Sequence, residues 1–197
     1  ICAEMMSGLP GQNLRNVLAC IGRAVNLGAV HISLYGLKVE EGTPFYDMEL
    51  IVPDEDEERE MYYYAEDFLK NMGLIRYEIS NFAFPGFESK HNLGYWHRTP
   101  YIGLGLGASS LSKEEIRYHN TTNLNYYLKH CMEPELICEE VSKLSRSDQM
   151  EEFMFLGLRC TKGIEVDQFE KLFGISLWSI YEEVLNLRLD LHLLRIQ

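Results

Sequence analysis

The sequence predicts an α/β fold for its first part and a small helical domain for its end. Over residues 1–80, short apolar runs rich in β-forming residues alternate with amphipathic helical segments, as in βαβ units. From about residue 145 the apolar residues recur at helical spacing. We therefore expect part of an α/β barrel or of a doubly wound sheet, followed by a helical domain of winged-helix type.

The first eighty residues carry strand and helix signals in turn. Asn13 is a good N-cap for a first helix, which Asn26-Leu27-Gly28 closes, and Gly73 stops a second helix. The expected elements are strands at 1–6, 30–37 and 77–79 and helices at 14–26 and 55–71. A strand, a helix and a strand within some forty residues imply parallel pairing with a right-handed crossover.

The rest of the chain is expected to divide at a linker. Residues 81–125 are interpreted as mostly irregular with a strand at 116–119, and residues 126–144 as the linker. Residues 145–197 form the helical domain, with Ser145 or Ser147 as the cap of its first helix. Its expected elements are helices at 150–159, 166–173 and 177–189 and the beginning of a strand at 193–196.

Composition and charge exclude several classes of function. The chain has 197 residues and a formal net charge of −12, which disfavours binding to nucleic acid. The helix at 178–188, which would read DNA in a winged-helix domain, is itself more acidic than basic at its exposed positions, so a packing or lid role is preferred. No segment is apolar over the length of a bilayer and no signal peptide is present, so a cytoplasmic location is expected. Five consecutive carboxylates at 54–58 are interpreted as a solvated loop that enters a helix N-terminus.

The cysteines indicate reduced, scattered thiols. No two of the five form a CxxC pair, and each is interpreted as a buried small side chain rather than a metal ligand. They are Cys2, Cys20, Cys131, Cys138 and Cys160. Because the chain starts at Ile1 and stops in mid-pattern, we interpret it as a piece of a longer protein.

A glycine run and the histidines are further candidates for binding. A glycine run at Gly103, Gly105 and Gly107 would let the backbone approach either a planar ligand or another strand. His31 lies in a buried-strand pattern and is expected to be a hydrogen-bonded core residue. Surface positions are expected for the other isolated histidines, which are His97, His119, His130 and His192.

The stretch His-Asn-Leu-Gly-Tyr-Trp at 91–96 is the sharpest of these candidates. An imidazole is a good ligand for iron, and aromatic rings supply flat apolar contact to a macrocycle. The alternative is a loop that its aromatic side chains anchor to the core. From these residues alone both readings stay open.

Several stretches occur together in one chain. They are EMMSGLPGQ at 4–12, HISLYGL at 31–37 with EGTP at 41–44, YEISNFA at 77–83, HNLGYW at 91–96, GLGAS at 105–109 and MEEFMFLGLR at 150–159. This combination resembles the C-terminal half of the HemN/HemW family of radical SAM proteins. That family contains the oxygen-independent coproporphyrinogen III oxidase and a haem-chaperone relative, and YEISNFA and HNxxYW point to the haem-chaperone branch.

The resemblance implies the C-terminal part of a partial TIM-like (β/α)₆ barrel that binds S-adenosylmethionine (SAM) and a [4Fe-4S] cluster. By the motif match, Glu4, Met6 and Gly36 would lie beside SAM, although Glu4 stands where the family usually has an aspartate. The family holds its cluster with a CxxxCxxC loop. This sequence lacks that loop, so it is expected to supply no iron–sulfur ligand and to do no radical chemistry alone.

The resemblance also implies haem binding at the HNxxYW stretch. His91 is the candidate ligand of the haem iron, and the other cofactor-binding candidates are Asn92, Tyr95 and Trp96. The expected function is to bind haem and pass it to acceptor proteins. The alternative is oxidative decarboxylation of coproporphyrinogen III through a 5′-deoxyadenosyl radical, and a third reading is a non-catalytic binding or regulatory module. Expected partners are haem or porphyrin and acceptor haem proteins, with a membrane-associated acceptor and a homodimer left open.

Overall fold

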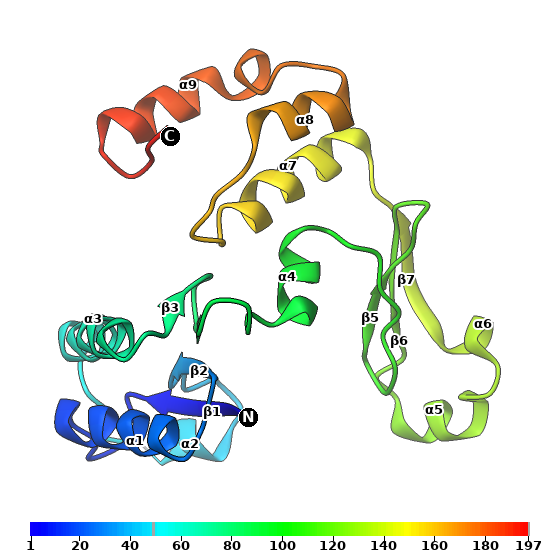
Figure 1. Cartoon of the computed structure of the whole chain (residues 1–197). Helices are drawn as coiled ribbons and strands as arrows, with labels where there is room; N and C mark the ends of the chain where they lie inside the picture. Colours follow the sequence, from blue (N-terminus) through cyan, green and yellow to red (C-terminus); the bar gives the residue numbers. More distant parts are fainter. Residues whose placement is uncertain (49, 197) are drawn as a thin grey trace. The chain divides into compact units, whose positions relative to one another are not determined.

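The computed structural model describes residues 1–48 and 50–196, so Glu49 and Gln197, the last residue of the expected helical domain, lie outside the described residues. The chain forms two structural units (Figure 1). The first holds residues 1–90 and 160–162, and the second holds residues 91–159 and 163–196. Sequence reasoning placed the division at a linker after residue 125. The division falls earlier because residues 91–125 pair with later segments of the second unit through a β-sheet and ion pairs.

The first unit contains a four-stranded sheet in the order β1-β2-β4-β3. Its strands are β1 (Cys2–Ser7), β2 (His31–Gly36), β3 (Ile75–Arg76) and β4 (Asn81–Ala83). Its helices are α1 (Leu14–Asn26), the short α2 (Pro44–Asp47) and α3 (Glu55–Asn71). β1 and β2 are parallel and joined through α1, which confirms the predicted βαβ unit. Figure 1 shows α1 beside this pair of strands.

The ends of α1 and α3 are fixed by side chains that the sequence already indicated. Asn13 caps α1 and Asp54 caps α3, each in a capping box that satisfies backbone N–H groups of the first turn. The first turn of α3 carries the carboxylates of residues 55–58, where the helix dipole favours negative charge. The interpretation of the acidic run is therefore confirmed.

One face of this sheet is apolar and packs against the two long helices. Ile32, Leu34 and Phe82 contribute the strand side of the core and are buried. The helix side consists of Val17 and Ile21 of α1 and of Met61, Ala65 and Leu69 of α3. The side chains of the alternate strand residues lie on the opposite face of the sheet, away from this apolar cluster.

The predicted third strand at Tyr77–Ile79 is wrong. The chain instead forms a hairpin, in which β4 runs antiparallel to both β2 and β3. β4 carries the fully buried Phe82, whereas Glu78 lies in the connection and accepts hydrogen bonds from the Ser80 backbone and the Asn81 side chain. Residues 81–83 form the strand because Phe82 places an apolar side chain in the core.

The second unit contains an antiparallel sheet in the order β5-β6-β7. Its strands are β5 (Ser109–Leu111), β6 (Ile116–Asn120) and β7 (Cys138–Lys143), and the helices around them are α4 (Lys90–Trp96), α5 (Leu124–His130) and α6 (Pro134–Ile137). The strand predicted at 116–119 is confirmed. The linker predicted at 126–144 is wrong, because this segment forms two helices and a strand. β7 is mostly exposed, so no apolar alternation marked it in the sequence.

Three helices complete the second unit, as the sequence predicted. They are α7 (Arg146–Gly157), which Ser145 caps, α8 (Val166–Phe173) and α9 (Leu177–Asp190). Met154, Phe169, Phe173 and Leu177 form their buried core. Residues 193–196 are not in a strand, so that expectation of the sequence is wrong.

The exposure of the thiols differs from expectation. Cys160 is buried, Cys138 is half-buried and the other three cysteines are exposed, so most are not the buried side chains that were predicted. Among the described residues no helix combines the length and apolar character required to cross a bilayer.

Candidate functional site

The polar face of the first sheet holds two of the three residues expected beside SAM. Glu4 and Met6 alternate along β1, and their neighbours across the parallel register are Ser33 and Tyr35 of β2. Both side chains are exposed, Met6 at 45%. Carboxyl ends of parallel strands are where ligands of α/β proteins bind. These two positions are therefore open to a ligand at the end of β1.

Gly36 lies at the end of β2, opposite Ser7, and so on the other side of the sheet from Glu4 and Met6. A Cβ at this position would collide with the carboxylate of Glu58, in the first turn of α3. The same carboxylate also lies 3.6 Å from the place of a Cβ at Gly8. Glu58 thus occupies the edge where β1 and β2 end. Sequence reasoning missed it, because it was one of five consecutive carboxylates.

His31 is the buried, hydrogen-bonded residue that the sequence predicted. Its Nε2 lies 2.8 Å from the Tyr77 hydroxyl, and its Nδ1 lies 3.0 Å from the Cys2 sulfur. Burial lowers the pKa of His31, against the opposing charges of Glu78 and Glu4. Both ring nitrogens are therefore engaged inside the protein.

Next to His31 lies a group of buried polar side chains that the sequence did not reveal. Tyr77, Glu78 and Asn81 are at most 8% exposed. Glu78 accepts hydrogen bonds from the Ser80 N–H and from the Asn81 side chain, and Tyr77 accepts one from the Ser89 N–H. The motif YEISNFA contains these residues, but the strand predicted at 77–79 hid their role as a buried polar group.

The HNLGYW stretch is a helix, α4, rather than a loop. Because residues four apart share a helix face, His91 lies over Tyr95 and Asn92 lies over Trp96. The His91 ring is exposed and meets the Tyr95 ring edge-on, with centroids 4.8 Å apart. Tyr95 in turn meets Tyr101 edge-on at 4.7 Å. Within the described residues, no hydrogen bond to the His91 imidazole is present.

Trp96 lies on the neighbouring, protein-facing side of α4. It is half-buried, and the guanidinium of Arg159 lies 4.6 Å from the centre of its ring. The buried Trp96 Nε1 has no hydrogen-bond partner among the described residues. Trp96 therefore anchors α4, whereas His91 faces outward.

An ion-pair network fixes the segment directly after α4. Arg98, in the left-handed region at a φ of 54°, donates to Glu152 of α7 at 3.0 Å and to Glu115 at 2.6 Å. Arg117 of β6 lies 2.9 Å from the other oxygen of Glu152. The side chains of Arg98 and Glu152 are only 9% and 12% exposed. Such a shielded network holds the end of α4 against α7 and the β5–β6 hairpin.

The glycine run serves packing at one position. A Cβ at Gly103 would collide with the Ser109 backbone, and the Asn120 side chain donates to the carbonyls of Gly103 and Gly105. Gly103 thus allows two backbone segments to approach. Of the remaining histidines, His97 and His192 are exposed, whereas His119 and His130 are half-buried beside Glu140 and Glu133, respectively.

The described residues do not form a site for an iron–sulfur cluster. No group of three or more His, Cys, Asp or Glu side chains among them is arranged to hold a metal ion. The cysteines are dispersed over β1, α1, the end of α5, β7 and residue 160. The donor set that the resemblance implies for [4Fe-4S] is therefore not met by this chain.

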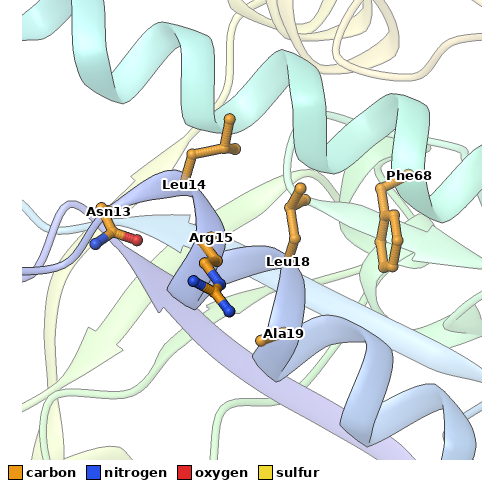
Figure 2. A pocket seen from close by; sticks show the side chains of 6 residues that line it. All are labelled: Asn13, Leu14, Arg15, Leu18, Ala19 and Phe68. Carbon is orange, nitrogen blue, oxygen red and sulfur yellow. The ribbon is translucent and has the colours of Figure 1, made fainter.

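A hollow of about 700 Å³ between α1 and α3 is a poorer candidate for chemistry. Figure 2 shows its lining, in which the side chains of Leu14, Leu18 and Phe68 are apolar. Asn13 and Arg15 lie at its border, and Asn13 already caps α1. The hollow offers no nucleophile and no acid or base.

Known sequences match nearly all of this chain. The family model "HemN C-terminal domain" matches residues 144–197. The "heme chaperone HemW" of Lactococcus lactis is 40% identical over 187 residues, which cover 93% of this chain and 48% of that protein. The heme chaperone HemW of Bacillus subtilis is 37% identical over 94% of this chain and 50% of its own length. The chain thus spans about half the length of the curated relatives it matches.

A solved structure matches the fold. Coproporphyrinogen III oxidase (HemN) from Escherichia coli, a radical SAM enzyme, superposes with a TM-score of 0.79 over 97% of this chain and 47% of that chain. Its sequence identity is 16%, so this likeness concerns the fold alone. With the two HemW relatives, it confirms the predicted α/β fold class. The chain belongs to the HemW/HemN family of radical SAM proteins.

Proposed function

We propose that this chain is the haem-binding part of a HemW-like chaperone, which binds haem and passes it to acceptor proteins. The proposal is supported by the relatives at 37% and 40% identity, whose names describe heme chaperones. The acceptors would be haem proteins, including membrane-associated ones, and the protein would act in the cytoplasm, as a homodimer or otherwise.

The observation that carries the proposal is the environment of His91. Its imidazole is exposed on α4, has no hydrogen bond among the described residues and stands against the edge of Tyr95. A neutral imidazole nitrogen that is not engaged by the protein can coordinate haem iron, and a flanking aromatic ring can contact the porphyrin. His31, the other histidine of the family motifs, has both nitrogens occupied.

The contacts that hold α4 in place also support a role of His91 in haem binding. Trp96 and Arg98 attach the helix to α7 through Arg159 and Glu152. An axial ligand held on a braced helix keeps its direction, and a braced site loses less conformational entropy when haem binds. Trp96 thus supports His91 and Tyr95, which would contact haem, and Asn92 would bind haem from the same helix.

SAM and a [4Fe-4S] cluster belong to the proposal only as cofactors of the whole protein. Glu4 and Met6 are open at the end of β1 and would face SAM, and Gly36 would approach it through its backbone. Bound together, the two cofactors would supply a 5′-deoxyadenosyl radical.

The experiment is a haem titration of the full-length protein that contains this chain. We expect the Soret band to shift and saturate at one haem per protein, and His91→Ala to weaken binding by at least about tenfold, since a ligand matters at least as much as its outer-shell partners. The exposed His97, which directly follows α4, is the matched control, so His97→Ala should bind as the wild type does.

Two outcomes would overturn the proposal. If wild type and His91→Ala titrate identically, His91 does not bind haem. The second candidate function is the oxidative decarboxylation that the sequence resemblance left as the alternative. Decarboxylation of coproporphyrinogen III by the reconstituted full-length protein, without stable haem binding, would establish that function instead.

A further inference from the structure

The first residue of β1 brings a thiol into line with an imidazole and a phenol. Cys2 is exposed, and its sulfur lies 3.0 Å from Nδ1 of His31. On the other side of the ring, Nε2 lies 2.8 Å from the hydroxyl of Tyr77, which the Ser89 N–H holds at 3.2 Å. Register pairs Cys2 directly with His31 on neighbouring parallel strands. Nucleophile, base and an orienting third group thus form a chain in which His31 is within hydrogen-bonding distance of both Cys2 and Tyr77.

The protons of this triad can be assigned from its surroundings. Burial lowers the pKa of His31, so its ring is neutral near pH 7. Burial also raises the pKa of Tyr77 to about 12, so the phenol keeps its proton. In the neutral tautomer that fits, the thiol donates to Nδ1 and Nε2–H donates to the Tyr77 oxygen. The carboxylates of Glu4 and Glu78 act on the ring and favour the imidazolium that forms when the thiol loses its proton.

The other cysteines provide contrasts within the same chain. Cys20 is exposed on α1 and has no hydrogen-bond partner among the described residues. Cys131 is exposed, and its only described contact is a long one, 3.9 Å, to the Leu128 carbonyl. Among the described residues, neither sulfur is hydrogen-bonded to a histidine. All three cysteines are exposed, so a faster reaction at Cys2 than at Cys20 or Cys131 is attributed to His31.

A second feature of this sheet face points to a ligand. Asn81 is 3% exposed, and its Oδ1 has no hydrogen-bond partner among the described residues. Asn81 pairs with Ser33, two residues from His31 on β2, so it lies on the same face as Cys2 and His31. An unsatisfied buried acceptor favours a ligand that brings N–H or O–H donors.

From this arrangement we propose that Cys2 is a reactive thiol that exchanges with a small peptide disulfide of the glutathione class. The Cys2 sulfur attacks one sulfur of the disulfide, the S–S bond of the ligand breaks, and a mixed disulfide with Cys2 forms. The thiol proton passes to His31 Nδ1 and then to the departing thiolate. Cys2 is thereby oxidised, and one equivalent of free thiol is released. This inference is independent of haem binding.

The test follows modification of each cysteine in the full-length protein. The protein is incubated with oxidised glutathione at pH 7, and the occupancy of the Cys2, Cys20 and Cys131 peptides is followed by mass spectrometry. We expect Cys2 to react at least about tenfold faster than Cys20, since His31 can accept the thiol proton as the sulfur attacks. A rate at Cys2 equal to or below that at Cys20 would overturn the proposal.

Two variants assign the effect to the triad. Tyr77→Phe keeps the ring and removes the hydroxyl, and His31→Asn replaces the base by a group that can form a hydrogen bond but cannot accept the thiol proton. Both should lower the Cys2 rate toward that of Cys20 and leave Cys20 unchanged, which also serves as the control for folding. If either variant is folded by near-ultraviolet circular dichroism and keeps the fast Cys2 rate, the triad does not activate the thiol.

Discussion

His31 and His91 occupy two regions that are built in opposite ways. His31 lies on a strand, is 6% exposed and has both ring nitrogens engaged by Cys2 and Tyr77. His91 lies on a short helix without a buried residue of its own, and its imidazole is exposed. A histidine occupied inside the protein can act on its neighbours, whereas only an unoccupied one is ready to bind an external metal.

The two regions are also held in place by different forces. The sheet that carries His31 rests on an apolar core, in which Phe82 and Ile32 are fully buried. The helix that carries His91 is held by ring contacts and by the Arg98–Glu152 ion pair. Truncation of an apolar side chain should therefore damage the first region most, and removal of a charge the second.

The largest effect is expected from Phe82→Ala. This change removes a fully buried ring from the sheet and should lower the free energy of unfolding by about 3–5 kcal/mol. Phe87→Ala, at a side chain that is 56% exposed, is the control and should change it by less than about 0.5 kcal/mol. Urea denaturation of both variants measures the difference. Equal midpoints for the two would contradict the assignment of the core.

The next effect is expected from Arg98→Ala. It leaves Glu152 with Arg117 as its remaining partner, so the loss should be about 2–3 kcal/mol. Arg59→Ala, which breaks the exposed pair with Asp56, should cost less than about 1 kcal/mol. Denaturation followed by tryptophan fluorescence in a Trp178→Phe background reports on α4 through Trp96. A loss no greater than that of Arg59→Ala would show that the network does not hold α4.

The smallest effect is a pH dependence from His31. Since burial lowers its pKa below the ordinary value of 6.5, the unfolded chain binds more protons than the folded one in the window just below pH 6.5. The contribution of His31 to stability is therefore complete above pH 6.5 and falls as the pH drops through that window. The difference in unfolding free energy between wild type and His31→Asn should shrink accordingly, whereas that for Phe87→Ala should stay constant.

The sequence predicted most accurately those elements whose ends are marked by local chemistry. Asp54 and Gly73 delimit α3, and the predicted bounds of 55–71 are those observed. α8 likewise ends at the left-handed Gly174 and matches its prediction at 166–173. Burial of His31 followed from the apolar strand around it.

What the sequence could not predict depends on contacts made through the backbone or over long distances. β7 pairs with β6 by main-chain hydrogen bonds while most of its side chains are exposed. Its sequence therefore lacks the apolar alternation of a strand, and it was interpreted as a linker. α4 read as a loop, because its seven residues include a glycine and are stabilised by Arg98 and Arg159 from outside. Tyr77 as the partner of His31 was missed for the same reason, since 46 residues separate them.

The most direct test of whether His91 binds haem iron is rescue of His91→Ala by free imidazole. The full-length variant is mixed with haem, with or without imidazole, and the haem that co-elutes with protein on gel filtration is recorded by its Soret spectrum. We predict that the variant elutes nearly free of haem and that imidazole restores the wild-type spectrum in the protein fraction, because it supplies the missing axial ligand. A variant that retains haem with the wild-type spectrum in the absence of imidazole would contradict the claim that His91 binds the iron.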